Sequence, residues 1–243
     1  MSRYLCHEQP ELLVFDTQVV DHRPGAVLLE RTAFFPGGGG QLADRGVLRW
    51  DGGEAIVQGI EVDDDREWHV IGGGAEPRGA VQGAVDAEFR QLMCQLHTGL
   101  HVLNALVFRS FHGALVTSAQ MMADGTARHD FDLPGADNAG LRALEAAVND
   151  VIRQDLAVRG IYVAREQAAA EPGLVRSKSV APPPQPDGTL RVIEIVGLDR
   201  QACGGTHLRS TGLSRPIRIL KVDNKGRHNR RVYIGLVGRD SPA

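Results

Sequence analysis

The sequence predicts an α+β protein, with a small β-barrel first and a mixed α+β domain after it. Three features lead to this class: a glycine-rich first third with short apolar runs, a stretch of helical periodicity after it, and a last third that returns to strands. The change of pattern near Asp86 places the division after residue 84 and predicts two domains, 1–84 and 85–243.

The first domain is predicted from its strands and turns. Short apolar runs such as 12–15 and 26–29 recur between turn-forming residues, and glycines cluster at 37–40, 52–53 and 72–74. Many short strands joined by glycine-rich turns are typical of a small barrel or sandwich. We therefore expect β-structure from residue 1 to about residue 82.

The second domain is predicted from helical and strand patterns. Between Asp86 and about Phe111, apolar residues recur close to the helical period, and a second helix is expected from about Asn138 to Val158. A strand pair is expected at 114–133, and single strands at 190–196, 217–222 and 231–237. Three adjacent prolines predict a stiff surface loop at 181–186.

Composition limits the class of protein. A hydrophobic content of 42% and a charged content of 23% are those of an ordinary soluble globular protein. No apolar run approaches the roughly 18 residues that span a bilayer, and the first residues lack a signal-peptide pattern, so we expect a cytoplasmic protein without a membrane partner. A net charge of −3 excludes a histone-like nucleic-acid binder but allows a local basic patch.

Two pairs of ligand-type residues predict a metal site. His97 and His101 are four residues apart on the first predicted helix and project from one face, while Cys203 and His207 have the same spacing around paired glycines. Either pair alone is a weak signal. One thiolate with three imidazoles suits tetrahedral Zn²⁺, so we predict one zinc ion per chain. Cys94, one helical turn before His97, is either a competing ligand or an ordinary buried cysteine.

These motifs resemble those of a known family. His97–His101 (HTGLH) and Cys203–His207 (CGGTH) resemble the two zinc motifs of the alanyl-tRNA synthetase editing domain, which also occurs in free-standing editing proteins of the AlaX group and has a relative in threonyl-tRNA synthetase. Residues 35–46 resemble the glycine-rich motif of the larger AlaX proteins, which carry a β-barrel before the editing domain. Arg128–Phe131 is similar to the family's Arg-aromatic-Asp-Phe stretch, although His129 stands where an aromatic or aliphatic residue is usual.

The resemblance implies hydrolysis of the ester that joins an amino acid to tRNA. Family analogy points to Ser or Gly wrongly attached to tRNA(Ala), and the absence of an ATP-binding motif or a synthetase domain implies ATP-independent editing in trans. Two other functions stay open: a deacylase of another mischarged tRNA such as Ser-tRNA(Thr), and a non-catalytic, zinc-stabilised RNA-binding module. The zinc ion either activates water or positions the substrate, and four protein ligands favour positioning.

Further site residues follow from their places beside these motifs. The candidate catalytic residues are Thr98, Gln41, Asp44, Arg128 and Asp130. The candidate substrate-binding residues are Gly38, Gly39, Gly40 and Thr206. The alternatives are ordinary packing for the threonines, a tight turn for the glycines and Asp44, and an ion pair for Arg128 and Asp130.

A basic cluster near the C-terminus predicts contact with tRNA phosphates. It straddles an expected hairpin at 224–226, and only Asp223 opposes it. The candidate tRNA-binding residues are Lys221, Lys225, Arg227, Arg230 and Arg231. The alternative is a solvated basic hairpin.

Overall fold

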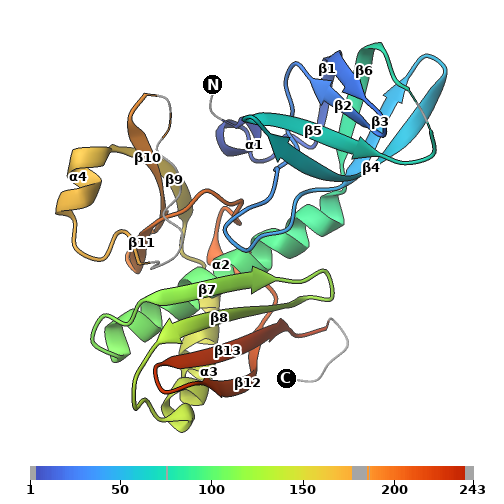
Figure 1. Ribbon diagram of the computed structural model, residues 1–243. Coiled ribbons are helices and arrows are strands. Elements are labelled where there is room, and N and C mark those ends of the chain that lie inside the picture. Colours follow the sequence, from blue (N-terminus) through green and yellow to red (C-terminus); the bar gives the residue numbers. More distant parts are fainter. Residues whose placement is uncertain (1–3, 75, 177–184, 186, 239–243) are drawn as a thin grey trace. The chain divides into compact units, whose positions relative to one another are not determined.

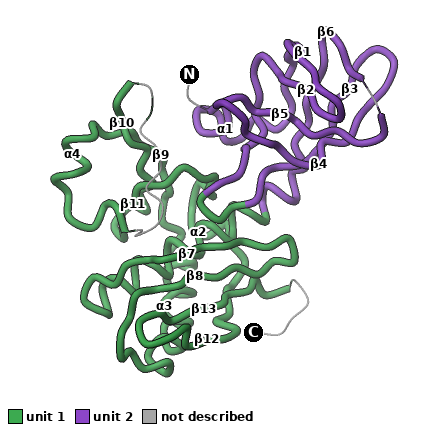
Figure 2. Tube along the Cα trace, viewed as in Figure 1, with its two compact units in different colours: residues 1, 39–41, 92–243 green, residues 2–38, 42–91 purple. Residues whose placement is uncertain are grey.

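The computed structural model describes residues 4–74, 76–176, 185 and 187–238, and the chain divides into two compact units (Figure 2). The barrel unit comprises residues 2–38 and 42–91, and the α+β unit comprises residues 1, 39–41 and 92–243. The predicted limit between residues 84 and 85 stays a prediction. Apart from Gln185, the proline-rich stretch 181–186 lies outside the described residues.

The barrel unit is a closed six-stranded antiparallel barrel, as predicted. Its strands follow the order β1-β2-β5-β4-β3-β6 (Figure 1). Their bounds are β1 (Val14–Arg23), β2 (Ala26–Leu29), β3 (Gly46–Trp50), β4 (Gly53–Asp63), β5 (Arg66–Ile71) and β6 (Gly79–Val85), preceded by the short helix α1 (Leu5–Glu8). Alternate residues point inward, and Phe15, Phe34, Leu48 and Val57 are among those that fill the interior.

The α+β unit contains two sheets and the predicted long helix. The four-stranded sheet has the order β12-β13-β8-β7, and the three-stranded sheet has the order β11-β10-β9. The element bounds are α2 (Ala87–Ser110), β7 (Val116–Met121), β8 (Thr126–Asp132), α3 (Asn138–Arg153), β9 (Val158–Ala164), α4 (Arg165–Ala170), β10 (Thr189–Ile195), β11 (Asp199–Ala202), a 3₁₀ turn η1 (Thr211–Leu213), β12 (Ile217–Lys225) and β13 (Asn229–Leu236). No helix among the described residues combines the length and the apolar character needed to cross a membrane.

Helices α2 and α3 both pack against the four-stranded sheet (Figure 1). Gly99 lets α2 approach closely, because a Cβ at this position would overlap the side chain of Ile217. Helix α3 covers the edge strand β12: Asn149 Oδ1 accepts from Ile217 N at 2.9 Å, and the carboxylate of Glu145 accepts from Ile219 N at 2.8 Å. These side chains satisfy backbone groups that an open sheet edge would leave unpaired.

The end of the second helix differs from the prediction. The helix is expected to reach Val158 because the apolar period continues through Leu156, but α3 ends at Arg153, since Asp155 adopts a left-handed conformation with φ of 52°. The Asp155 carboxylate accepts from Gly212 N at 3.1 Å, which fixes this turn. The chain then enters β9, a strand that the periodicity did not predict.

Candidate metal centre

Helix α2 supplies two of the four predicted metal ligands. Leu96, Leu100 and Leu103 of this helix are fully buried, so the turn that carries His97 and His101 lies inside the α+β unit. Both imidazoles are 6% exposed, and their ring centroids are 5.1 Å apart, as expected for an i,i+4 pair on one helix face.

The other two ligands lie on the loop that follows β11. Cys203 is held by a bond from its N–H to Arg191 O at 3.1 Å, and its sulfur accepts from Gly205 N at 3.4 Å. A side chain at Gly205 would overlap the His97 ring and come within 2.7 Å of Gln41 Oε1. Glycine is therefore required here for the loop to lie against the helix.

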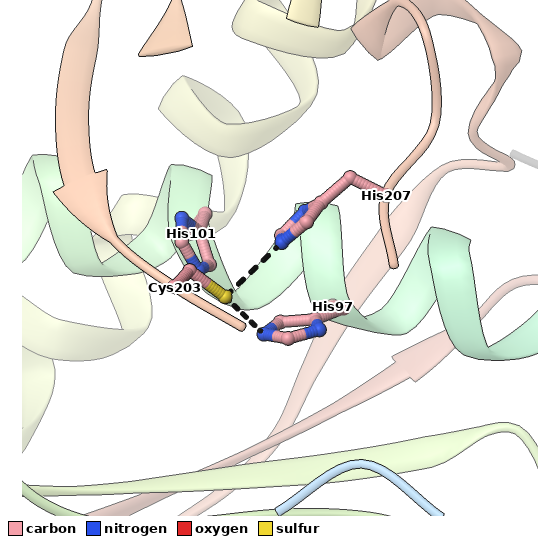
Figure 3. Close-up of side chains that lie close together, drawn as sticks. All are labelled: His97, His101, Cys203 and His207. Carbon is pink, nitrogen blue, oxygen red and sulfur yellow. Dashed lines mark hydrogen bonds between the residues drawn. The ribbon is translucent and has the colours of Figure 1, made fainter. Parts of the chain in front are cut away.

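The four side chains meet in one cluster (Figure 3). Cys203 Sγ lies 3.3 Å from His97 Nε2 and 3.4 Å from His207 Nε2, and one donor atom from each of the four residues lies within 4.8 Å of the others. The His207 ring centroid is 4.2 Å from that of His97 and 4.5 Å from that of His101. These distances are short enough for all four residues to hold a single metal ion.

Burial sets the protonation of the cluster. Burial, with smaller effects of nearby His129 and Arg191, lowers the pKa of His97 to about 3. Burial and the neighbouring His97 likewise hold the pKa of His101 well below its usual range. Both imidazoles are therefore neutral and keep a lone pair for a metal. Burial raises the pKa of the Cys203 thiol, so a bound cation is what would favour its thiolate form.

Two predicted site residues lie within hydrogen-bond distance of imidazoles of the cluster. Gln41 Oε1 lies 2.8 Å from His97 Nδ1, and Thr98 Oγ1 lies 3.3 Å from His207 Nδ1. When each Nδ1–H donates to its oxygen, each Nε2 is left as the lone-pair nitrogen on the side of Cys203. His101 Nδ1 has no hydrogen-bond partner among the described residues.

Gln41 also ties the glycine-rich segment to the loop of Cys203. Its Oε1 accepts from Thr206 N at 3.0 Å, and its Nε2 donates to Thr206 Oγ1 at 2.7 Å. Gly40, with φ of 89°, has no room for a side chain beside Ala119 O, and its own carbonyl accepts from Met121 N at 2.8 Å. Glycine at position 40 thus lets this segment run along β7 and deliver Gln41 to His97. Gly38 and Gly39 also have positive φ, but open space surrounds them.

The remaining candidate catalytic residues are bound elsewhere. Asp44 lies in the barrel unit, where it is fully buried and pairs with Arg90. Asp130 and Arg128 point away from the side chains of β8 that face the core. Asp130 accepts two bonds of 2.7 Å from Arg231 and two of 3.2 Å from Arg128.

Two residues near the cluster, His129 and Arg191, were not among the predicted site residues. His129 is 6% exposed on the core-facing side of β8, next to Ala119 in the sheet register, and Arg191 is buried in β10. The sequence feature that marks them is a polar side chain at a strand position that faces the core. Strand periodicity alone does not connect such a residue with a functional site. Cys94 lies outside the cluster, with its sulfur 3.3 Å from Thr206 Oγ1.

The basic hairpin between β12 and β13 is only partly available for contacts. Lys221 pairs with Asp223 at 2.9 Å, Arg231 is bound by Asp130, and Arg230 is buried with its Nε donating to Ala136 O at 3.2 Å. Lys225 and Arg227 are exposed at the tip and have no ion pair with any described residue.

Comparison with known proteins finds relatives that align with most of this chain. Residues 190–233 match the family model of the threonyl and alanyl tRNA synthetase second additional domain. The alanyl-tRNA editing protein AlaX-M of Saccharolobus solfataricus is 35% identical over 223 residues, which cover 90% of this chain and 92% of the relative. The AlaX-M protein of Methanosarcina barkeri is 33% identical over 219 residues, covering 87% and 88%. The alanine–tRNA ligase of Korarchaeum cryptofilum is 33% identical over 223 residues, which are 91% of this chain but 25% of the ligase.

Proposed function

Because this chain belongs to the AlaX-M family of alanyl-tRNA editing proteins, we propose that it hydrolyses the ester between tRNA(Ala) and a wrongly attached serine or glycine. The observation that carries the proposal is the cluster of His97, His101, Cys203 and His207 in a chain aligned with these relatives over nearly its full length. The AlaX-M relatives are matched over about nine-tenths of their length and are named editing proteins, and we propose editing in trans on tRNA charged by a separate synthetase.

A separate hydrolase is needed because a synthetase pocket selects poorly between small amino acids. A pocket built for alanine cannot exclude the smaller glycine, and it rejects the added hydroxyl of serine by only about 10²-fold. A second site that accepts the wrong amino acid and cleaves its ester removes the error after it is made.

We infer that the cluster holds one zinc ion. A tetrahedral zinc ion with bonds of about 2.3 Å to sulfur and about 2.0 Å to nitrogen places these atoms about 3.5 Å apart. The Sγ–Nε2 distances of 3.3 and 3.4 Å agree with this separation between two ligand atoms. Held by these four residues, a zinc ion would supply Lewis acidity at the place where the α-amino group or the ester of the substrate binds. Because four side chains would fill a tetrahedral shell, the site offers no free position for a water molecule, and we propose that the attacking water comes from outside the shell. Direct contact between the ion and the substrate would require the shell to expand to five ligands.

The surrounding residues take roles that follow from their contacts. We propose that Gln41 and Thr98 keep His97 and His207 in the metal-binding orientation, while Thr206 and the backbone of Gly38, Gly39 and Gly40 border the substrate. Buried donors and acceptors of this kind fix ligand geometry better than mobile surface groups. For Asp44, Arg128 and Asp130 we propose supporting roles, because their charged groups are already bound to one another or to neighbouring arginines.

The proposal predicts a selective deacylase. Purified protein is expected to release serine or glycine from mischarged tRNA(Ala) and to leave Ala-tRNA(Ala) largely intact. The measurement is the loss of labelled amino acid from a panel that also contains Ser-tRNA(Thr) and correctly charged Ser-tRNA(Ser). Preference for Ser-tRNA(Thr) would instead identify a deacylase for another tRNA. Binding without hydrolysis of any substrate would identify an RNA-binding module.

Within the basic cluster, we propose that Lys225 and Arg227 at the tip of the hairpin contact tRNA. Replacing Lys225 and Arg227 with alanine is expected to weaken tRNA binding, because both are exposed and have no acidic partner among the described residues. Each lost phosphate contact should reduce the slope of log affinity against log salt by just under about 1 unit.

The control removes the same charge from exposed positions elsewhere in the α+β unit, as Arg142→Ala with Arg159→Ala. Binding is measured at several salt concentrations. A slope for the Lys225 and Arg227 variant equal to that of the native protein would move the tRNA contacts away from the hairpin.

A further inference from the structure

A buried positive charge lies beside the loop of Cys203. Arg191 in β10 is 6% exposed, and its Nη1 donates to the main-chain oxygens of Cys203 at 2.9 Å and Gly205 at 2.8 Å. Its own carbonyl accepts from Cys203 N at 3.1 Å. Arg191 therefore forms hydrogen bonds to the loop with both its main-chain carbonyl and its guanidinium group.

No acidic side chain of the described residues forms an ion pair with this guanidinium group. Among the described residues Arg191 has no ion pair, and its buried Nε has no hydrogen-bond partner. An unpaired buried charge costs several kcal/mol, so a protein retains one where something nearby offsets the cost. The loop that Arg191 contacts carries Cys203, whose sulfur would bind a metal as a thiolate and would then supply a negative charge.

Another largely buried arginine of the same unit has different partners. Arg176 is also largely buried, but it forms an ion pair with Asp199 and stacks on the ring of Phe108, with its Cζ 3.9 Å from the ring centroid. Those contacts account for the burial of Arg176 within the fold. The two contacts of the Arg191 guanidinium both go to the metal-site loop.

We propose that Arg191 is a positioning residue of the metal centre. It fixes the carbonyls of Cys203 and Gly205, so that the sulfur and the His207 ring are held facing the two histidines of α2 before a metal binds. The inference rests on the proposed metal site. Within that site, Arg191 preorganises the loop that carries Cys203 and His207. Outer residues that orient metal ligands typically contribute about 10- to 100-fold to metal affinity.

The test measures metal affinity and stability separately, on the full chain without tRNA. Zinc affinity is obtained by competition with a chromophoric chelator, and the ligand geometry is followed by the absorption spectrum of the cobalt-loaded protein. Arg191→Met is expected to lower zinc affinity about 10- to 100-fold and to alter the cobalt spectrum. The metal-free protein should unfold near the native midpoint, because removal of an unpaired charge offsets two lost hydrogen bonds. Arg191→Lys, which keeps the charge, should recover part of the affinity.

The matched control is Arg176→Met. It should give the opposite pattern, with reduced stability because Asp199 loses its partner, and with native zinc affinity in the folded protein. Native affinity in Arg191→Met would overturn the proposal, as would an equal loss of affinity in the control. If Arg191→Met does not fold, Arg191→Lys decides: native affinity and a native cobalt spectrum overturn the proposal, and reduced affinity supports it.

The outcomes also separate this proposal from the proposed function. If zinc affinity depends on Arg191 but the native protein cleaves no aminoacyl-tRNA, the proposed function is contradicted and the positioning role stands. A native protein that deacylates tRNA while Arg191→Met keeps full zinc affinity contradicts only the positioning role.

Discussion

Replacing Gly205 with alanine is expected to abolish both metal binding and deacylation. The native protein should carry about one equivalent of zinc, and Gly205→Ala should carry almost none. The added methyl group would overlap the imidazole of His97 and lie 2.7 Å from Gln41 Oε1. The loop must therefore retreat, and Cys203 and His207 move with it. Since a 1 Å displacement of a positioned group can cost about 10²-fold in rate, we expect a loss of at least about 100-fold in kcat/KM.

The control for this substitution is Gly59→Ala. Nothing lies within 4 Å of the Cβ that alanine would place at position 59, so native zinc content and activity are expected there. The measurements are elemental analysis of protein purified without added metal and the rate of amino-acid release from Ser-tRNA(Ala). Full zinc content and activity in Gly205→Ala would mean that the loop does not lie against His97. Cys203→Ala, which removes a ligand without adding bulk, should lose zinc as well.

The barrel and the long helix could be predicted because their patterns are local. Short apolar runs between glycine turns define the barrel strands, and seven apolar positions at helical spacing define α2. The end of α3 could not be predicted in this way. The apolar period runs on through Leu156, but Asp155 turns the chain by bonding to Gly212, a residue 57 positions later. A contact at that separation leaves no periodic signal.

The same distinction applies to the metal centre. Each ligand pair is visible because spacing four on a helix or a tight loop brings two side chains together. The residues that orient the ligands come from elsewhere in the chain: Gln41 reaches His97 across 56 positions, and Arg191 bonds to the carbonyl of Gly205 from a neighbouring strand. Gln41 was selected for its place in the glycine-rich segment, and its bond to His97 Nδ1 gives it a physical role. Arg191 lay within an apolar strand pattern, where one charge is ordinarily taken as an exposed position.

Removal of the Asp44 carboxylate is expected to destabilise the barrel without emptying the metal centre. Asp44 is fully buried and accepts bonds from Arg90 Nε at 3.0 and 3.1 Å and from Phe35 N at 2.6 Å. Arg90, which is 4% exposed, also donates to Ala33 O at 2.8 Å. Breaking a buried pair by deleting one partner leaves an uncompensated charge, which typically costs about 3–5 kcal/mol. Asp44→Ala should therefore lower the free energy of unfolding by about this amount in a urea titration.

The double variant distinguishes support from catalysis. Replacing Asp44 with leucine and Arg90 with methionine removes both charges, and exchange of a whole buried pair for apolar side chains is often neutral. We expect this variant to recover most of the stability lost in Asp44→Ala, and to keep native zinc content and deacylation. A stable double variant that holds zinc but has lost deacylation would show that the Asp44–Arg90 pair takes part in the reaction, because the barrel would then be intact without it.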